Sequence, residues 1–268
     1  MTEISRLTSA PILLTGGTGT LGRLVLGRLR RAGSKTRILS RNHHENDAAV
    51  EYARGDLATG QGVRNALDGC EIVIHCAGSA KGDNEKAENL VKAAQVEGAL
   101  HIVFISVVGA DKVPISSAID RALFGYYGAK FRSEQLIADS GIPWTTLRAT
   151  QFHDLVLTTV RGMAKMPVVP VPKGVRFQPI DAAEVADRMV ELAAGSPAGM
   201  VPAIGGPRIY QMSDLLRSYL DAVGKKRLIM NIGMPGRAAR AIRDGANLAP
   251  SRSVGVNTWE DFLVQDES

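Results

Sequence analysis

The chain has 268 residues, of which 45% are hydrophobic, 22% charged and 5% aromatic. This balance is typical of a globular protein with a sizeable core, and it excludes a disordered or fibrous chain. The net charge of +5 raises the question of a nucleic-acid partner. Because the basic residues are scattered and are not interleaved with aromatic residues, we expect no nucleic-acid partner, and expect solvated helix faces or an anionic small ligand instead.

The first ten residues, MTEISRLTSA, contain a glutamate and precede a short apolar run, which fits neither a signal peptide nor a membrane anchor. No later stretch approaches the roughly 20 apolar residues of a membrane span. Cys70 and Cys76 flank a predicted strand, and this extended geometry keeps them from pairing easily. We therefore expect a cytoplasmic protein with two reduced thiols, no membrane partner and no metal site.

Short β-branched runs alternate with longer amphipathic segments in the first part of the chain. We expect strands at residues 12–15, 36–40, 50–54, 71–75, 101–106 and 144–148. Apolar residues recur at helical spacing in residues 22–32, 84–95 and 126–139, which predicts helices there. Strands separated by helices favour an α/β fold, namely a Rossmann-type doubly wound parallel sheet with helices on both faces.

The alternation weakens after about residue 151. A proline-rich run at 165–174 precedes predicted helices at 182–194, 213–222 and 235–247. We expect residues 1–150 to form the nucleotide-binding Rossmann core, and residues 151–268 to complete the core and to form a small substrate-binding elaboration. The basic segment GRAARAIRD could lie on a membrane surface, but its apolar face is mainly alanine, which argues against that role.

A glycine-rich loop, TGGTGTLG, follows the first predicted strand and opens the first predicted helix. Its first glycine permits a sharp turn, its second lets a pyrophosphate approach the backbone, and its third lets the helix pack closely on the sheet. The helix N-terminus then directs N–H groups at the phosphates. In this context the motif predicts a dinucleotide site rather than a bare turn. The site comprises Gly16, Gly17, Thr18, Gly19, Thr20, Leu21 and Gly22.

The end of the second predicted strand indicates which nucleotide binds. Ser40, Arg41 and Asn42 stand where an NAD-binding fold places an acidic residue against the ribose 2′-hydroxyl. No acid is present, and an arginine can hold a 2′-phosphate with two hydrogen bonds. Arg41 therefore favours NADP(H) as the cofactor, although a surface arginine at a strand end is also common.

Tyr126 and Lys130 are four residues apart in a predicted helix, so they share one face. A nearby ammonium favours the phenolate and lowers the tyrosine pKa, which suits a general acid or base. The neighbouring Tyr127 has Phe131 at the same spacing, so Tyr126 is in the productive register. The alternative is a partly buried tyrosine beside a lysine whose stem lies on the protein surface.

These motifs together resemble the short-chain dehydrogenase/reductase superfamily, in its atypical, NmrA-like branch. The resemblance covers about the first 195 residues. It rests on TGGTGTLG, RILSRN, GDL, HCAG, FISVVGAD, YYGAK, SEQLIADSGIPWTTLRATQFHD and FQPIDAAEVADRMVEL. The glycine motif and the tyrosine–lysine pair occur across the superfamily, whereas LRATQFHD and FQPIDAAEVA are more specific to this branch.

The resemblance implies further site residues. It places Asp56 and Leu57 against the adenine ring, and Ser106 against the substrate oxygen as the third catalytic residue. Lys130 would also hold the nicotinamide ribose. Beside the nicotinamide and its ribose it places Cys76, Ala77, Gly78, Ala149, Thr150 and Phe152.

Two departures from the family pattern, and two other features of the sequence, bear on this assignment. Ser106 is followed by valines rather than by small or hydroxylic residues, so Ser116 or Ser117 could take its place. The frequent proline after "LR" is Ala149 here. His153 and Asp154 could form a polar pair in the substrate pocket or could cap a helix. The long connection at residues 109–125 could close over substrate.

The sequence thus predicts an NADP(H)-dependent oxidoreductase that acts on a small carbonyl, alcohol or quinone, with Tyr126 and Lys130 as the acid–base pair. Two alternatives remain: a non-catalytic NADP(H)-binding redox sensor or regulator, and an epimerase-like enzyme of the same superfamily. A small-molecule substrate is the expected partner. A homo-oligomer or a protein partner stays open, as do the substrate and the direction of reaction.

Overall fold

The computed structural model describes residues 7–78, 82–98 and 101–266. Part of the N-terminal segment considered above, residues 1–6, lies outside the described residues. The chain divides into two compact units, and each is built from several segments of the chain. Unit 1 comprises residues 1–106, 129–147 and 183–201, and unit 2 comprises residues 107–128, 148–182 and 202–268.

A seven-stranded parallel sheet forms the centre of the fold, with the order β3-β2-β1-β4-β5-β6-β9. Its strands are β1 (Ile12–Thr15), β2 (Thr36–Ser40), β3 (Val50–Arg54), β4 (Ile72–His75), β5 (His101–Val107), β6 (Trp144–Ala149) and β9 (Gly199–Met200). The order reverses at β1, which pairs with β2 on one side and β4 on the other. This arrangement confirms the predicted doubly wound α/β fold, in which ligands bind where the strand order reverses.

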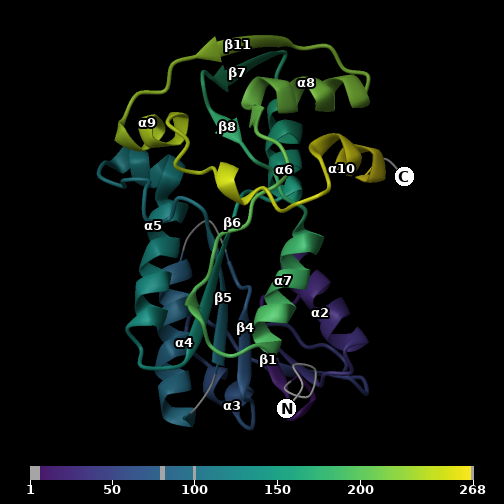
Figure 1. Ribbon diagram of the computed structural model, residues 1–268, viewed down its shortest axis with the longest axis vertical. Helices are drawn as coiled ribbons and strands as arrows, with labels where there is room; N and C mark the ends of the chain where they lie inside the picture. The colour runs from purple at the N-terminus through teal and green to yellow at the C-terminus, as the bar shows by residue number, and fades with distance from the viewer. Residues whose placement is uncertain (1–6, 79–81, 99–100, 267–268) are drawn as a thin grey trace. The chain divides into compact units, whose positions relative to one another are not determined.

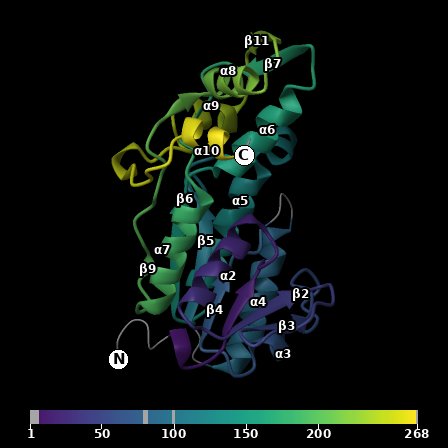
Figure 2. The same ribbon diagram turned by 90° about the vertical axis from the view of Figure 1, so that its right-hand side faces the viewer.

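Helices cover both faces of the sheet in unit 1 (Figures 1 and 2). They are α2 (Thr20–Arg31), α3 (Val63–Leu67), α4 (Asp83–Glu97), α5 (Ala118–Ala138) and α7 (Ala182–Ala194), of which α5 belongs to unit 1 from residue 129 onward. On one face, α2 and α7 are joined by an ion pair between Arg28 and Asp187. On the other face, Gln95 of α4 donates a hydrogen bond to the carbonyl oxygen of Ser140, just after α5.

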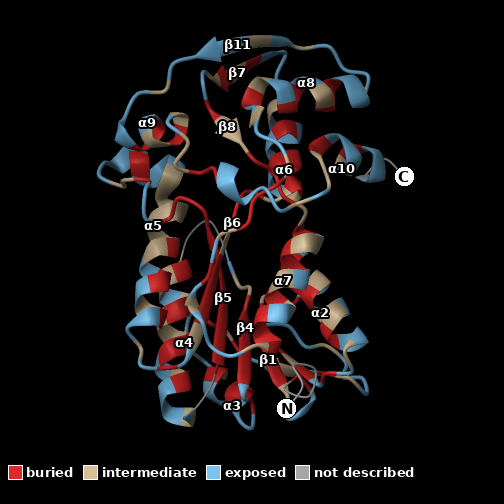
Figure 3. Cartoon of the chain, in the orientation of Figure 1, coloured by how far each residue is buried: buried red, intermediate tan, exposed pale blue. Residues whose placement is uncertain are grey.

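The central strands β1, β4 and β5 are buried because helices shield them on both faces. Every residue of β1 and β5 is buried, as Figure 3 shows for β5. Such continuous apolar runs are typical of parallel strands that are covered on both sides. The core between the sheet and α3, α4 and α5 includes Leu13, Val73, Leu90, Phe104 and Ile137.

Unit 2 has two small two-stranded sheets and its own core. Its elements are α6 (His153–Met163), β7 (Val168–Pro172), β8 (Arg176–Phe177), β10 (Tyr210–Gln211), α8 (Met212–Ala222), β11 (Leu228–Ile232), α9 (Arg237–Arg243), the 3-10 helix η1 (Pro250–Arg252) and α10 (Trp259–Asp266). β7 pairs in parallel with β11, and β8 pairs antiparallel with β10. A core around the fully buried Trp259 joins α6, α8 and α10.

One sequence expectation is wrong in its boundary. Helix α5 begins at Ala118, so the second half of the connection predicted at 109–125 is helical. The start of α5 is fixed by reciprocal hydrogen bonds: Asp120 N donates to Ser117 Oγ at 3.0 Å, while Ser117 N donates to Asp120 Oδ2 at 3.0 Å. Ser116 Oγ also donates to Asp120 Oδ2. This is a capping box, and it engages both of the alternative serines in a structural role.

Candidate functional site

The glycine-rich loop connects β1 to α2, as predicted. Gly16 has a φ of +71°, and a Cβ at this position would lie 2.6 Å from the backbone nitrogen of Ala77. A Cβ at Gly22 would lie 2.0 Å from the carbonyl oxygen of Gly16. Both glycines are therefore required by the fold itself. Gly17 is buried, and a Cβ at this position would meet the side chain of Ile38.

Gly19 is different, because protein packing does not account for it. It is exposed, its φ is −81°, and a Cβ there would meet only the Gly16 carbonyl oxygen, at 3.3 Å. Gly19 is the N-cap residue of α2. Since no side chain caps α2 and no acid stands in its first turn, the loop fits the pyrophosphate of a dinucleotide.

The other residues of this loop divide between the core and the surface. Leu21 is buried in the core, whereas Thr18 and Thr20 are exposed beside Gly19. Arg23, which the sequence reasoning passed over, donates from Nε to the carbonyl oxygen of Thr18 at 2.8 Å. This contact holds the exposed side of the loop in position.

Ser40, Arg41 and Asn42 lie at the carboxyl end of β2, beside the switch in strand order. Ser40 Oγ accepts a hydrogen bond from Asn42 N at 3.2 Å and shares another with His44 Nε2 at 3.1 Å, and these contacts shape the turn. The Arg41 side chain is exposed. An exposed guanidinium at this strand end suits the recognition of a phosphate group.

Asp56 and Leu57 occupy the loop after β3. Asp56 Oδ1 accepts a hydrogen bond from Ala58 N at 2.9 Å, and Asn89 of α4 donates to the carbonyl oxygen of Leu57 at 2.8 Å. The Leu57 side chain is buried in the core of unit 1. Only the backbone of Leu57 is therefore placed for a contact with an adenine ring.

Lys130 is the most constrained side chain among the predicted catalytic residues. It is 2% exposed, and its Nζ donates to the carbonyl oxygen of Ile105 in β5 at 3.2 Å. Nζ also lies 3.4 Å from Oδ2 of Asp83 and 4.8 Å from the centre of the Phe104 ring. Burial lowers the pKa of Lys130, and the Asp83 carboxylate opposes that shift.

Asp83 is the site residue that sequence reasoning missed. It is the first residue of α4 and is 2% exposed, and Lys86 Nζ lies 3.6 Å from its Oδ1. Gly78 joins the same group, since a Cβ there would lie 3.5 Å from Lys130 Nζ. The loop after β4 and the first turn of α4 thus meet Lys130 at the carboxyl end of the sheet.

Two further groups beside Lys130 are electrically neutral. Burial raises the pKa of the Cys76 thiol to about 12, which favours its protonated form. Burial and the charge of Lys130 lower the pKa of His75 to about 3. The His75 ring makes a 2.6 Å hydrogen bond to Thr15 Oγ1, so it is a satisfied core group. Both cysteines are free, as predicted.

Tyr126 and Lys130 both lie in α5, one turn apart, as predicted. The adjacent Tyr127 packs edge-on against Tyr126 and belongs to the core of unit 2, where burial raises its pKa. Ser106, near the end of β5, is 4% exposed. Its hydroxyl has no hydrogen-bond partner among the described residues, so an orphaned polar group stands at this strand end.

The residues predicted to line the nicotinamide pocket lie between β6 and α6 in unit 2. Thr150 is buried, and its hydroxyl donates to the carbonyl oxygen of Gln178 at 2.5 Å. Ala149 is also buried, and Phe152 is the half-buried N-cap residue of α6. His153 stacks on Phe262 and hydrogen-bonds to the carbonyl oxygen of Asn257, so it belongs to the unit 2 core.

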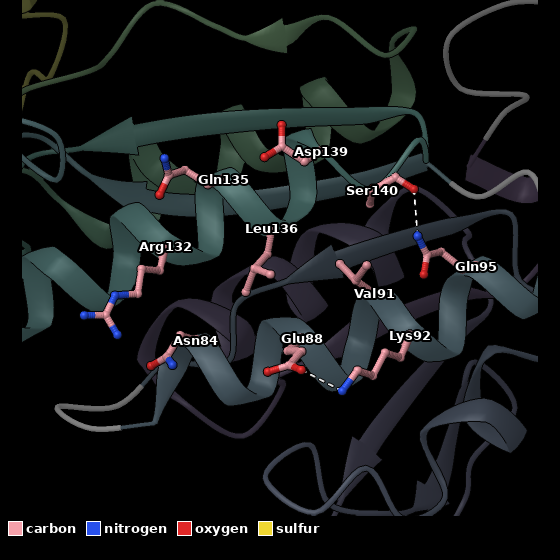
Figure 4. Close-up of a pocket in the computed structure, with 10 residues that line it drawn as sticks. All are labelled: Asn84, Glu88, Val91, Lys92, Gln95, Arg132, Gln135, Leu136, Asp139 and Ser140. Carbon is pink, nitrogen blue, oxygen red and sulfur yellow. Dashed lines mark hydrogen bonds and ion pairs between the residues drawn. The ribbon is translucent and has the colours of Figure 1, made fainter.

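A groove of about 590 Å³ lies between α4 and α5 in unit 1 (Figure 4). Its lining contains none of the predicted site residues. Its charged side chains are partly paired, as in the contact of Lys92 with Glu88 at 2.6 Å. The groove is therefore separate from the nucleotide site.

Comparison with known proteins agrees with this geometry. Residues 16–196 match a family model described as NAD(P)H-binding. In curated proteins, a (4-alkanoyl-5-oxo-2,5-dihydrofuran-3-yl)methyl phosphate reductase of Streptomyces griseus is 29% identical over 203 residues, which cover 73% of this chain and 68% of the relative. An NAD(P)H azoreductase of Xenophilus azovorans is 24% identical over 257 residues, which cover 89% of this chain and 87% of the relative.

The fold also has a close match among solved structures. An NADPH-dependent quinone oxidoreductase of Escherichia coli, solved with NADPH, superposes with a TM-score of 0.79 at 20% identity, covering 96% of this chain and all of that chain. The match extends over both units of the present chain. The chain therefore belongs to the NAD(P)H-binding family, with the fold and the relatives of an NAD(P)-dependent oxidoreductase, which confirms the resemblance predicted from its sequence.

Proposed function

We propose that this protein is an NADPH-dependent reductase of a small carbonyl or quinone, with Tyr126 as its general acid. The observation that carries the proposal is the setting of Lys130. Its ammonium is buried at the carboxyl end of β5, held by Asp83 and by the carbonyl oxygen of Ile105, one helical turn from Tyr126. A buried cation beside a phenol stabilises the negative charge that forms when the phenol gives up its proton.

The unexplained glycine of the first loop supports the cofactor assignment. Gly19 leaves open the N-terminus of α2, where backbone N–H groups would bind the pyrophosphate. Arg41, exposed at the end of β2, would bind the 2′-phosphate that distinguishes NADP(H) from NAD(H). Asp56 and the Leu57 backbone would contact the adenine.

The proposed chemistry divides between the bound group and the chain. When bound, the reduced nicotinamide would supply a hydride to the carbonyl carbon. Tyr126 would give its phenolic proton to the carbonyl oxygen, and Lys130 would stabilise the phenolate and hold the nicotinamide ribose. Ser106, whose hydroxyl has no partner among the described residues, would orient the same oxygen.

The activities of the relatives favour reduction. Of the relatives named above, the two curated proteins are reductases of a phosphorylated furanone and of azo compounds, and the solved structure is a quinone oxidoreductase. Conjugated, electron-poor groups are common to these substrates. A small conjugated carbonyl or quinone is therefore the substrate class that we propose for this chain.

The test is a pair of fluorescence titrations with NADPH and NADH, followed by a screen for NADPH oxidation with quinones, conjugated ketones, aldehydes and azo dyes. We expect tighter binding of NADPH and turnover with at least one of these classes. Binding of NADPH and NADP⁺ with different affinities, but no turnover on any class, would overturn the proposal. That outcome would favour a redox sensor.

A further inference from the structure

The β7–β11 ribbon of unit 2 has two chemically different faces. Its parallel register pairs Leu228 with Val168, Met230 with Pro170 and Ile232 with Pro172. Because side chains alternate along a strand, these six residues share one face. The other face carries Ile229, Asn231, Val169 and Val171.

The two faces differ in burial most clearly along β7, since β11 is also exposed at Asn231. Val169 and Val171 are at most 1% exposed and pack in the core of unit 2 with α6 and α8. On the opposite face the exposed fractions are 66% for Leu228, 50% for Met230 and 41% for Val168. Figures 1 and 3 show β11 as an outer, largely exposed strand of unit 2. A contiguous apolar face of this kind marks an interaction surface.

Basic residues stand at both ends of this ribbon. The segments 164–174 and 223–243 contain no aspartate or glutamate. The nearest acids in sequence are Asp154 and Asp181 for the first segment, and Asp221 and Asp244 for the second. The exposed cations of the two segments are Lys165, Lys173, Lys225, Lys226, Arg237 and Arg240. Since the strands are parallel, Lys165, Lys225 and Lys226 precede the ribbon, while Lys173, Arg237 and Arg240 follow it.

The charge of this surface indicates what covers it. A second copy of the chain that docked through the same face would place its cations against the cations of the first copy, and the like charges would repel. An anionic lipid surface offers phosphates to the cations and an acyl boundary to the apolar face. We propose that the exposed face of the β7–β11 ribbon docks this protein on an anionic phospholipid membrane.

The docking is peripheral. No helix in the described part of the chain is long and apolar enough to cross a bilayer. The sequence argued against a membrane role for the basic segment that contains α9, because its apolar face is mainly alanine. The ribbon supplies the apolar face that α9 lacks, and α9 supplies part of the charge, with Arg237 and Arg240 exposed and Ala238 and Ala239 buried.

Vesicle co-sedimentation of the full chain tests the proposal. We expect binding to vesicles of phosphatidylcholine with about one third phosphatidylglycerol, weak binding to pure phosphatidylcholine, and release at high salt, because salt screens the attraction. Met230→Asp abolishes the binding, whereas Val254→Asp, a control at a 58% exposed valine outside the ribbon, leaves it intact. Lys225→Ala with Lys226→Ala weakens it roughly 25-fold, at about fivefold for each cation.

The control for Lys225→Ala with Lys226→Ala is the double variant Arg31→Ala with Lys35→Ala, which also removes two positive charges, but from unit 1. It has little effect on binding to the anionic vesicles. Three results would overturn the proposal. The first is equal binding to both kinds of vesicle, or binding to neither. The second is a lipid-free dimer that Met230→Asp dissociates, since a second copy would then cover the face. The third is RNA binding that depends on Met230, without any binding to the anionic vesicles.

Discussion

Lys130 and Asp83 form a buried ion pair, with Nζ 3.4 Å from Oδ2 and both side chains at most 3% exposed. A buried charge that loses its partner is strongly destabilising, because neither water nor a counter-charge replaces the lost contact. We expect Asp83→Asn to lower the free energy of unfolding by about 3 kcal/mol in urea denaturation.

A double-mutant cycle distinguishes this pair from ordinary packing. The double variant Asp83→Asn with Lys130→Met should recover part of the loss, since it leaves no uncompensated charge at Lys130. Asp187→Asn removes the more exposed contact with Arg28 and should cost less than about 1 kcal/mol. Equal costs for Asp83→Asn and Asp187→Asn would contradict the buried pair.

The glycines of the first loop separate stability from cofactor binding. A Cβ at Gly19 would meet only the Gly16 carbonyl oxygen, at 3.3 Å, so Gly19→Ala should lose much less stability than Gly22→Ala and should weaken NADPH binding about tenfold, or about 1.4 kcal/mol. Gly22→Ala places its Cβ 2.0 Å from the Gly16 carbonyl oxygen and should fail to fold or lose stability. Thermal unfolding and NADPH titration measure the two effects. Unchanged NADPH affinity in Gly19→Ala would show that the loop does not hold the pyrophosphate.

Arg41 is expected to determine the choice of nucleotide. Charge-assisted hydrogen bonds to a phosphate contribute about 1.5 kcal/mol or more, so Arg41→Ala should weaken NADPH binding at least tenfold and leave NADH binding unchanged. Arg54→Ala, at the end of the adjacent strand β3, is a matched loss of an exposed arginine. An equal loss for NADPH and NADH, or an equal effect of Arg54→Ala, would exclude specific recognition by Arg41.

His75 should make stability depend on pH. Its pKa is about 3 in the folded chain and about 6.5 when unfolded. The unfolded state therefore binds more protons between these values, and stability falls as the pH falls below about 6.5, by up to about 1.4 kcal/mol per pH unit. The urea concentration at the unfolding midpoint should fall more between about pH 7.5 and about pH 5 for the wild type than for His75→Gln. An identical loss in both proteins would show that His75 is not the titrating group.

The sequence predicted every strand of the sheet except β9, which has only two residues. The central strands are apolar runs, a local signal that needs no knowledge of distant contacts. The start of α5 is also encoded locally, in the Ser117 to Asp120 capping box, which lies inside the connection expected at 109–125. The spacing of apolar residues alone does not show this helix start.

Asp83 and the β7–β11 ribbon could not be found in this way. Asp83 acts through contacts with Lys130, 47 positions later in the chain, and an acid at a helix start is ordinarily only a favourable partner of the helix dipole. β7 contains two prolines, which argue against a strand, and its partner β11 is about 60 residues away. Burial and pairing at such separations depend on the tertiary fold.

The most direct test of the proposed function compares two adjacent tyrosines. Tyr126→Phe and Tyr127→Phe each remove one hydroxyl from α5, and NADPH titration checks that both variants still bind the nucleotide. With a substrate from the NADPH oxidation screen, we expect Tyr126→Phe to lower kcat about 100-fold or more, the usual contribution of a general acid, and Tyr127→Phe to stay within a few-fold of the wild type. Full turnover by Tyr126→Phe would contradict the assignment of Tyr126 as the proton donor.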